Sequence, residues 1–172
     1  MNTRASLGQW LEGFLWLAVI CWGIGLGAKL FEFVVVISAW SANPPSSLAL
    51  MPYGPKFPFN PGDFFQPLSA ILALATIGVV VSGRKQSSKY KRLLWVPLIS
   101  LLIIWLATPT LFWPMIRGLY GAGTGLRPLP DLAVHSLVHR WIVLDWLRTL
   151  FIAIGFLFSI RAISTIPRTH EA

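Results

Sequence analysis

Two pairs of charged side chains within very apolar stretches are the residues of this chain best suited to chemistry. Lys29 and Glu32 stand three residues apart near the end of the first apolar run, and Asp145 and Arg148 stand three apart in the last. A spacing of three places both members of each pair on one helix face. Ionisable groups in membrane-like segments are costly and indicate a functional site. Here the two cations would stabilise an enolate or phenolate, and a carboxylate would move the proton.

Two histidines four residues apart raise the question of a metal site. His135 and His139 would share one helix face, a spacing that metal sites use. A third ligand would have to be Glu32 or Asp145, and Asp145 points away from the histidine face at 100° per residue. We therefore predict no metal and interpret the histidines as solvated interfacial residues. Acid/base catalysis by His139 is the alternative.

Further side chains are candidates for contacting a ligand. Trp141 shares a helical stripe with Asp145 and Arg148, and an aromatic ring in such a stripe can form the floor of a pocket. Thr108 precedes Pro109, so the favoured interpretation of its hydroxyl is a hydrogen bond to a backbone group freed by the proline. The candidates for ligand contact are Trp40, Thr108, Arg117 and Trp141.

The composition assigns the chain to the membrane-embedded class. Of its 172 residues, 55% are hydrophobic and only 12% charged, which is too much apolar surface for one soluble core. The net charge is +8, and the excess of positive side chains lies where the apolar runs end. This distribution is typical of membrane proteins and not of nucleic-acid binding. Cys21 is the single cysteine, so neither an intramolecular disulfide nor a cysteine metal cluster is possible. The first run has no cleavage-site pattern, so we expect a retained helix.

The apolar runs predict a single domain with four spans, at about residues 11–40, 64–83, 93–113 and 141–161. The loop at 84–92 carries five positive and no negative side chains, so it should face the cytoplasm. Arg4 at one end of the chain, with Arg161 and Arg168 at the other, places both termini on that side as well. The predicted fold is an all-α, antiparallel four-helix transmembrane bundle in the plasma or inner membrane.

Two longer loops then face outward. The loop at 41–63 is rich in proline, which forbids a regular helix, and its aromatic residues suit either an interfacial anchor or a lid. The loop at 114–140 contains a glycine-rich run from Arg117 that resembles a dinucleotide fingerprint superficially. We reject that interpretation because no βαβ unit surrounds the run.

This topology brings the two charged pairs to one depth. At 1.5 Å per residue, Lys29 lies about 25 Å from Glu12, and Asp145 lies about 24 Å from Arg161. Both pairs therefore lie in the outer leaflet, and the first and fourth helices should be neighbours. Pairing of Lys29 with Asp145, and of Glu32 with Arg148, would bury four charges that sum to zero. A structural clamp and a functional site both remain open.

Several short motifs resemble those of the anthrone oxygenase-like family of small four-helix membrane proteins. They are Gly25-x-Gly27-Ala28-x-x-Phe31-Glu32, Trp40-x-x-Asn43-Pro44-Pro45-Ser46, Phe64-Phe65-x-Pro67-Leu68-Ser69, Thr108-Pro109 with Pro114, and Trp141-x4-Trp146-Leu147-Arg148-Thr149. The resemblance covers most of the chain. It implies oxidation of a phenolic, anthrone-like substrate by dioxygen without a recognised cofactor.

Three classes of function follow from these observations. The first is an oxygenase-like enzyme that acts on a hydrophobic phenolic or lipid-like substrate from the outer leaflet, with no cofactor. The second is a non-enzymatic protein that binds lipid or a small molecule, or an accessory subunit. The third is a transporter, which the absence of a sequence repeat disfavours. The expected partners are membrane lipids and a hydrophobic small molecule, with a homo-oligomer or a partner membrane subunit left open.

Overall fold

The computed structural model describes residues 3–53 and 56–166, with side chains from Gly8 onward. Arg168, one of the predicted cytoplasmic charges, lies outside the described residues, as does the side chain of Arg4. All regular structure in the described part of the chain is helical, and no strand occurs there.

The elements follow one another as long helices joined by short turns. Their bounds are α1 (Thr3–Phe31), the π-helix η1 (Glu32–Ile37), α2 (Ser38–Ser41), the 3₁₀-helix η2 (Ser46–Leu50), α3 (Pro61–Ser82), the 3₁₀-helix η3 (Gly83–Lys85), α4 (Ser88–Ala107), the π-helix η4 (Thr108–Phe112), α5 (Trp113–Gly123) and α6 (Asp131–Ser164).

Four of the resulting helical stretches are long and apolar enough to cross a membrane. They are Gly8–Ser41, Pro61–Lys85, Ser88–Gly123 and Asp131–Ser164. The predicted all-α class with four long apolar helices is therefore confirmed. All four stretches are longer than the predicted spans, the last two most of all, because α5 continues the third helix beyond residue 113 and α6 begins at Asp131. At 1.5 Å per residue, α6 is about 51 Å long and exceeds a hydrocarbon core of about 30 Å.

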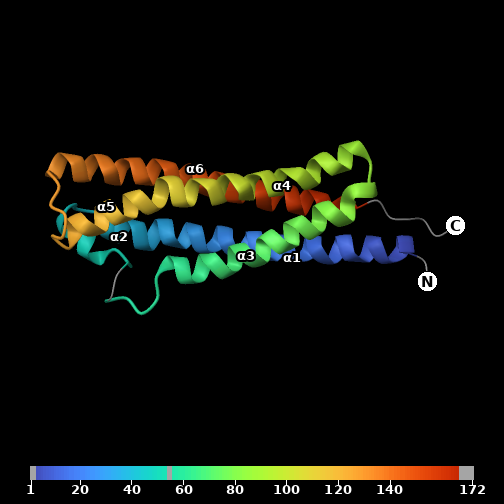
Figure 1. Ribbon diagram of the computed structural model, residues 1–172, viewed down its shortest axis with the longest axis horizontal. Helices are drawn as coiled ribbons and strands as arrows, with labels where there is room; N and C mark the ends of the chain where they lie inside the picture. The colour runs from blue at the N-terminus through green and yellow to red at the C-terminus, as the bar shows by residue number, and fades with distance from the viewer. Residues whose placement is uncertain (1–2, 54–55, 167–172) are drawn as a thin grey trace.

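The long helices form a bundle in which each contacts two others along its length (Figure 1). α1 packs against α3 and α6, and α4 packs against the same two helices. The start of α1 and the end of α6 lie toward the same end of the molecule. The predicted contact between the first and last long helices is confirmed.

Small residues let α1 and α6 approach closely. A Cβ on Gly155 would stand 2.5 Å from the ring of Trp22, so only glycine fits there. Gly23 and Gly27, one helical turn apart on α1, differ in their surroundings. Gly23 faces Phe156 of α6 at 3.2 Å, whereas nothing lies within 4 Å of a Cβ on Gly27. Of these two glycines, only Gly23 therefore faces a neighbouring helix, and Gly27 is exposed.

The start of α3 is fixed by a capping box. The side chain of Asn60 accepts a hydrogen bond from the backbone N–H of Gly62 at 2.8 Å, and Asp63 Oδ2 accepts from the backbone N–H of Asn60 at 2.9 Å. Pro61 occupies the first helical turn, where its missing N–H costs nothing. The proline-rich loop therefore ends in a rigid corner.

Two π-helical segments interrupt the long helices at the level of the charged residues. η1 begins at Glu32, and Ser38 Oγ donates to the carbonyl of Phe33 at 3.1 Å within this wider turn. η4 contains Pro109, and Thr108 Oγ1 donates to the carbonyl of Ile104 at 2.7 Å. The Thr108 hydroxyl therefore bonds the backbone beside the proline, but its partner is a carbonyl that already accepts the backbone N–H of Thr108 and not one that Pro109 frees. π-Helical turns often occur at functional sites because they displace side chains from the regular helical register.

Candidate functional site

The four charged residues singled out in the sequence form one connected network. Lys29 Nζ donates to Glu32 Oε2 at 2.6 Å and to Asp145 Oδ2 at 2.7 Å. Arg148 Nη2 donates to Asp145 Oδ1. Asp145 is 0% exposed and Lys29 is 2% exposed, so the network is buried at its centre.

The pairing differs in part from the prediction. Lys29 pairs with Asp145 as expected, but Arg148 also pairs with Asp145, and a pair between Glu32 and Arg148 is not among the ion pairs of the described residues. The reason is helical spacing, because Asp145 lies one turn before Arg148 and both its oxygens face the cations. Asp145 thus pairs with one cation from each of two helices, and Glu32 supplies the second negative charge.

A cavity of about 570 Å³ lies beside this network. α1, η1, the outer loop, α3, α4, η4, α5 and α6 all contribute to its wall. The residues with polar side chains among those that line it are Lys29, Glu32, Tyr53, Asn60, Gln66, Ser69, Thr108, Arg117 and Arg148. Asp145 is not part of the wall, because Lys29 and Arg148 stand between it and the open space. Asp145 therefore positions the two cations and does not face a ligand.

The two cations retain hydrogen-bond donors for a guest. An ammonium has three N–H donors, and the two carboxylates use two of those on Lys29. On Arg148, the Nη1 atom has no hydrogen-bond partner among the described residues and is not buried, whereas the Nε atom also lacks a partner but is buried. The guanidinium also lies over the ring of Phe112, 4.0 Å from its centroid, which fixes its orientation.

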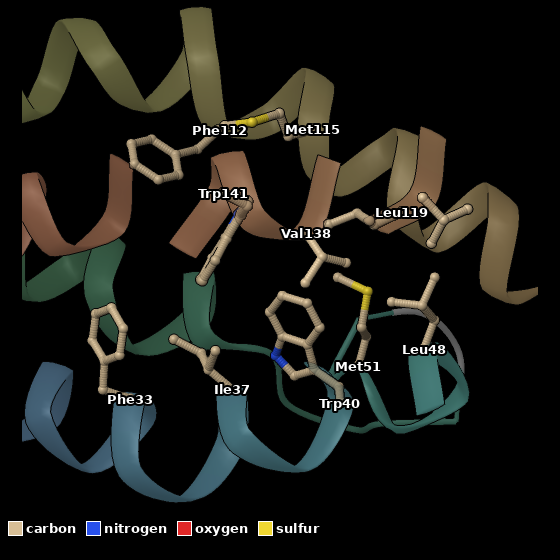
Figure 2. Close-up of a cluster of buried hydrophobic side chains, with 11 residues drawn as sticks. Phe33, Ile37, Trp40, Leu48, Met51, Phe112, Met115, Leu119, Val138 and Trp141 are labelled. Atoms are coloured by element: carbon tan, nitrogen blue, oxygen red, sulfur yellow. The ribbon is translucent and has the colours of Figure 1, made fainter. Parts of the chain in front are cut away.

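Trp40 and Trp141 lie behind the network and not in the cavity wall. Both belong to a buried hydrophobic cluster that η1, α2, η2, η4, α5 and α6 share (Figure 2). Their rings pack edge to face with centroids 5.2 Å apart, and Trp141 meets Phe112 in the same way at 6.0 Å. The ring of Trp141 also lies 5.8 Å from Lys29 Nζ. The two tryptophans, predicted as ligand contacts, thus lie outside the cavity wall, where Trp141 packs beside Lys29 and Trp40 packs on Trp141.

The other predicted residues divide between the cavity and the surface. Thr108 and Arg117 line the cavity as expected for ligand contacts, and Arg117 is exposed at its rim. His135 and His139 are exposed on α6 and are not part of the wall, so the structure does not bring His139 to the network. Among the described residues, no group of three or more histidine, cysteine or acidic side chains could hold a metal ion.

Most cavity residues were not among the predicted site residues, and three of them bear on the shape and chemistry of the site. Gly25 stands one helical turn from Lys29 and leaves open space where a side chain would otherwise project. Gln66 follows the capped start of α3, and Tyr53 comes from the outer loop. Burial raises the pKa of Tyr53, Glu32 raises it further, Arg148 lowers it and Asp145 raises it. Tyr53 is therefore a neutral phenol and a hydrogen-bond donor beside the network. The aromatic residues of the loop were a signal for it, but their spacing did not tell which one turns inward.

Comparisons with models of protein families, with curated proteins and with solved structures each gave no match.

Proposed function

We propose that the protein is an oxygenase-like membrane enzyme that takes a hydrophobic phenolic substrate into its cavity and oxidises it with dioxygen, without a cofactor. In this proposal the four long helices form an antiparallel transmembrane bundle in the plasma or inner membrane, with both termini in the cytoplasm. The cavity then opens in the outer leaflet. The motifs shared with the anthrone oxygenase-like family support the same reaction class.

One observation carries the proposal. A carboxylate and two cations line the same largely apolar cavity: Glu32, Lys29 and Arg148. Glu32 would take a proton from an activated C–H or O–H group of the substrate. Lys29 and Arg148 would donate hydrogen bonds to the enolate or phenolate that forms. Since the proton passes from substrate to Glu32 inside the cavity, the total charge of the site does not change. The proton transfer therefore costs little electrostatic free energy in a low-dielectric bundle.

The oxidation itself is balanced by dioxygen alone. The deprotonated carbon of a methylene group transfers electrons to dioxygen and forms a hydroperoxide with it. Loss of water from the hydroperoxide then leaves a carbonyl, so that one oxygen atom enters the product and the other leaves as water. The protein's residues hold the substrate, and Glu32 accepts the first proton and returns it to the peroxide to give the hydroperoxide. Glu32 then takes the second C–H proton and passes it to the departing hydroxide, which leaves as water.

The buried charges of the network sum to zero without a ligand, and this favours a second function. Lys29, Glu32, Asp145 and Arg148 already balance one another's charges, so the network is also suited to holding a ligand without chemistry. In that case the protein is a lipid-binding or small-molecule-binding protein or an accessory subunit. Turnover of dioxygen separates the two functions.

The test is oxygen consumption by the purified protein in lipid nanodiscs with a hydroxylated anthrone as substrate. Glu32→Gln should lower turnover by about 10²–10⁴-fold, the usual effect of removing a general base. Glu12→Gln is the matched control, because Glu12 is an exposed residue of α1. If the parent consumes no oxygen above the uncatalysed rate, the enzymatic function is wrong. If Glu32→Gln turns over like Glu12→Gln, Glu32 is not the base.

A further inference from the structure

The cavity is elongated along the helices. Its wall on the first helical stretch runs from Cys21 to Glu32, eleven residues apart, which corresponds to about 16 Å of helix. On the third stretch it runs from Leu101 to Arg117. A ligand that fills this space is therefore longer than a single aromatic ring.

The two ends of the cavity differ in polarity. Beyond Lys29, toward the middle of the bundle, the wall is apolar. It consists mainly of Cys21, Trp22, Gly25, Leu72, Leu101 and Ile152. Five of these six belong to one buried hydrophobic cluster, so they meet at one end of the cavity. The other end carries the polar side chains of Tyr53, Asn60, Gln66 and Arg117.

The charges between the two ends decide what kind of polar group fits. Lys29 and Arg148 are balanced by Glu32 and Asp145, so the buried network has no net charge. A carboxylate or phosphate ligand would add a negative charge that no buried cation is free to neutralise. A neutral hydroxyl, by contrast, can accept from the free donors and donate to Glu32.

We infer that the ligand is an alkylated phenol, whose ring lies at the charged network and whose alkyl chain fills the apolar end. This inference names the substrate class of the proposed function and rests on it for the phenolic ring. From Lys29 to Cys21 is eight residues, or about 12 Å, the length of an extended chain of about nine carbons. Such a molecule enters with its chain inward and its ring toward the outer loop.

Gly25 and Gly27 provide a matched pair of variants for the test. A Cβ on Gly25 meets only Leu68, at 3.7 Å, so a leucine there fits the backbone and projects into the apolar end. A Cβ on Gly27 meets nothing within 4 Å, and Gly27 is exposed on the lipid-facing side of the same helix. Both variants, G25L and G27L, therefore add the same leucine, but only the first shortens the cavity.

The measurement is the Kd of 4-alkylphenols with side chains of two to twelve carbons, in nanodiscs of one lipid composition. For G27L, the Kd should fall about fourfold per methylene group up to about nine carbons and then level off. For G25L it should level off at about three to four carbons, since Gly25 is one turn from Lys29. Partition of the phenol into the lipid is the same for both variants, so it cancels in the ratio of the Kd of G25L to the Kd of G27L. This ratio should exceed about tenfold for 4-nonylphenol.

Each outcome decides a different point. If 4-ethylphenol binds neither the parent nor G27L, the proposed function fails. If the short phenols bind and the ratio stays constant with chain length, only the inference about the chain fails. If decanoate binds the parent more tightly than 4-nonylphenol does, the inference that the polar group of the ligand is a neutral phenol is wrong. Should G25L not fold, the pair Gly25→Ala and Gly27→Ala must show the same direction of change with a smaller ratio, or the inference is overturned.

Discussion

Lys29 and Asp145 are 116 residues apart in the chain, yet the ammonium and the carboxylate meet at 2.7 Å with both side chains almost completely buried. This ion pair joins the first helical stretch to the last. Because Asp145 also accepts from Arg148, one carboxylate holds two cations against the cavity. Removing either partner of a buried pair leaves a charge without compensation, which costs far more than the pair contributes as a whole.

A double-mutant cycle on this pair measures that asymmetry. Lys29→Met and Asp145→Asn should each lower the free energy of unfolding by about 3–5 kcal/mol, because each strands a buried charge. The double variant should recover much of this loss, since Glu32 and Arg148 then remain with opposite charges. The readout is the melting temperature of all four proteins in one detergent.

Activity separates a structural clamp from a site in the same cycle. If the pair only clamps the helices, the double variant regains both stability and any phenol binding. In a site, stability returns while binding or turnover stays low, because the donors that face the cavity are gone. Single variants that melt like the parent would show that Lys29 and Asp145 are neither clamp nor site.

The contact of Gly155 with Trp22 predicts a strong effect of one methyl group. Gly155→Ala places a Cβ 2.5 Å from the indole, so α1 and α6 must separate or the ring must move. Such overpacking typically costs about 1–3 kcal/mol, although alanine is the better helix former. Thermal unfolding should show the loss for Gly155→Ala and not for Gly27→Ala, whose position is open. Equal stability of both variants would contradict the close approach of these helices.

Tyr53 predicts a change in stability at high pH. Burial and the neighbouring Glu32 raise the pKa of this phenol in the folded protein above its ordinary value of 10.0. The contribution of the neutral phenol to the free energy of unfolding is therefore fully present below pH 10.0, and it is lost as the pH rises through the higher pKa of the folded protein. Tyr53→Phe should melt with a weaker pH dependence than the parent above pH 10. Parallel curves of melting temperature against pH would show that Tyr53 does not lie in this environment.

The proposed topology is tested by labelling cysteines in intact cells, in a Cys21→Ser background. Ser87 is exposed in the basic turn between α3 and α4, and Ser46 is exposed at the opposite end of the bundle. We expect Ser46→Cys to react with a membrane-impermeant maleimide from outside. Ser87→Cys should react only after the cells are opened, because five cations hold that turn in the cytoplasm. Labelling of position 87 from outside would show that the proposed orientation in the membrane is wrong.

The charged network shows how far helical periodicity can predict a site. A spacing of three put Lys29 with Glu32 and Asp145 with Arg148 on single faces, and counting residues from the helix ends put both pairs at one depth. That Lys29 meets Asp145 followed from these two facts. The partner of Arg148 did not follow, because the choice between Glu32 and Asp145 depends on the rotation of α1 against α6 and on the π-turn at Glu32. A π-turn has no reliable sequence signal.

The sequence by itself determined the class of the protein, the four apolar helices and the residues whose burial needs a partner. Each of these depends on composition and on the cost of placing polar groups in hydrocarbon, which act locally along the chain. The tertiary structure decided which side chains face the cavity. Trp40 and Trp141 pack behind the network, His139 faces outward, and Tyr53 turns inward from the outer loop. These positions depend on how helices far apart in the sequence rotate and pack together, and that is fixed by contacts between residues that periodicity within one helix cannot relate.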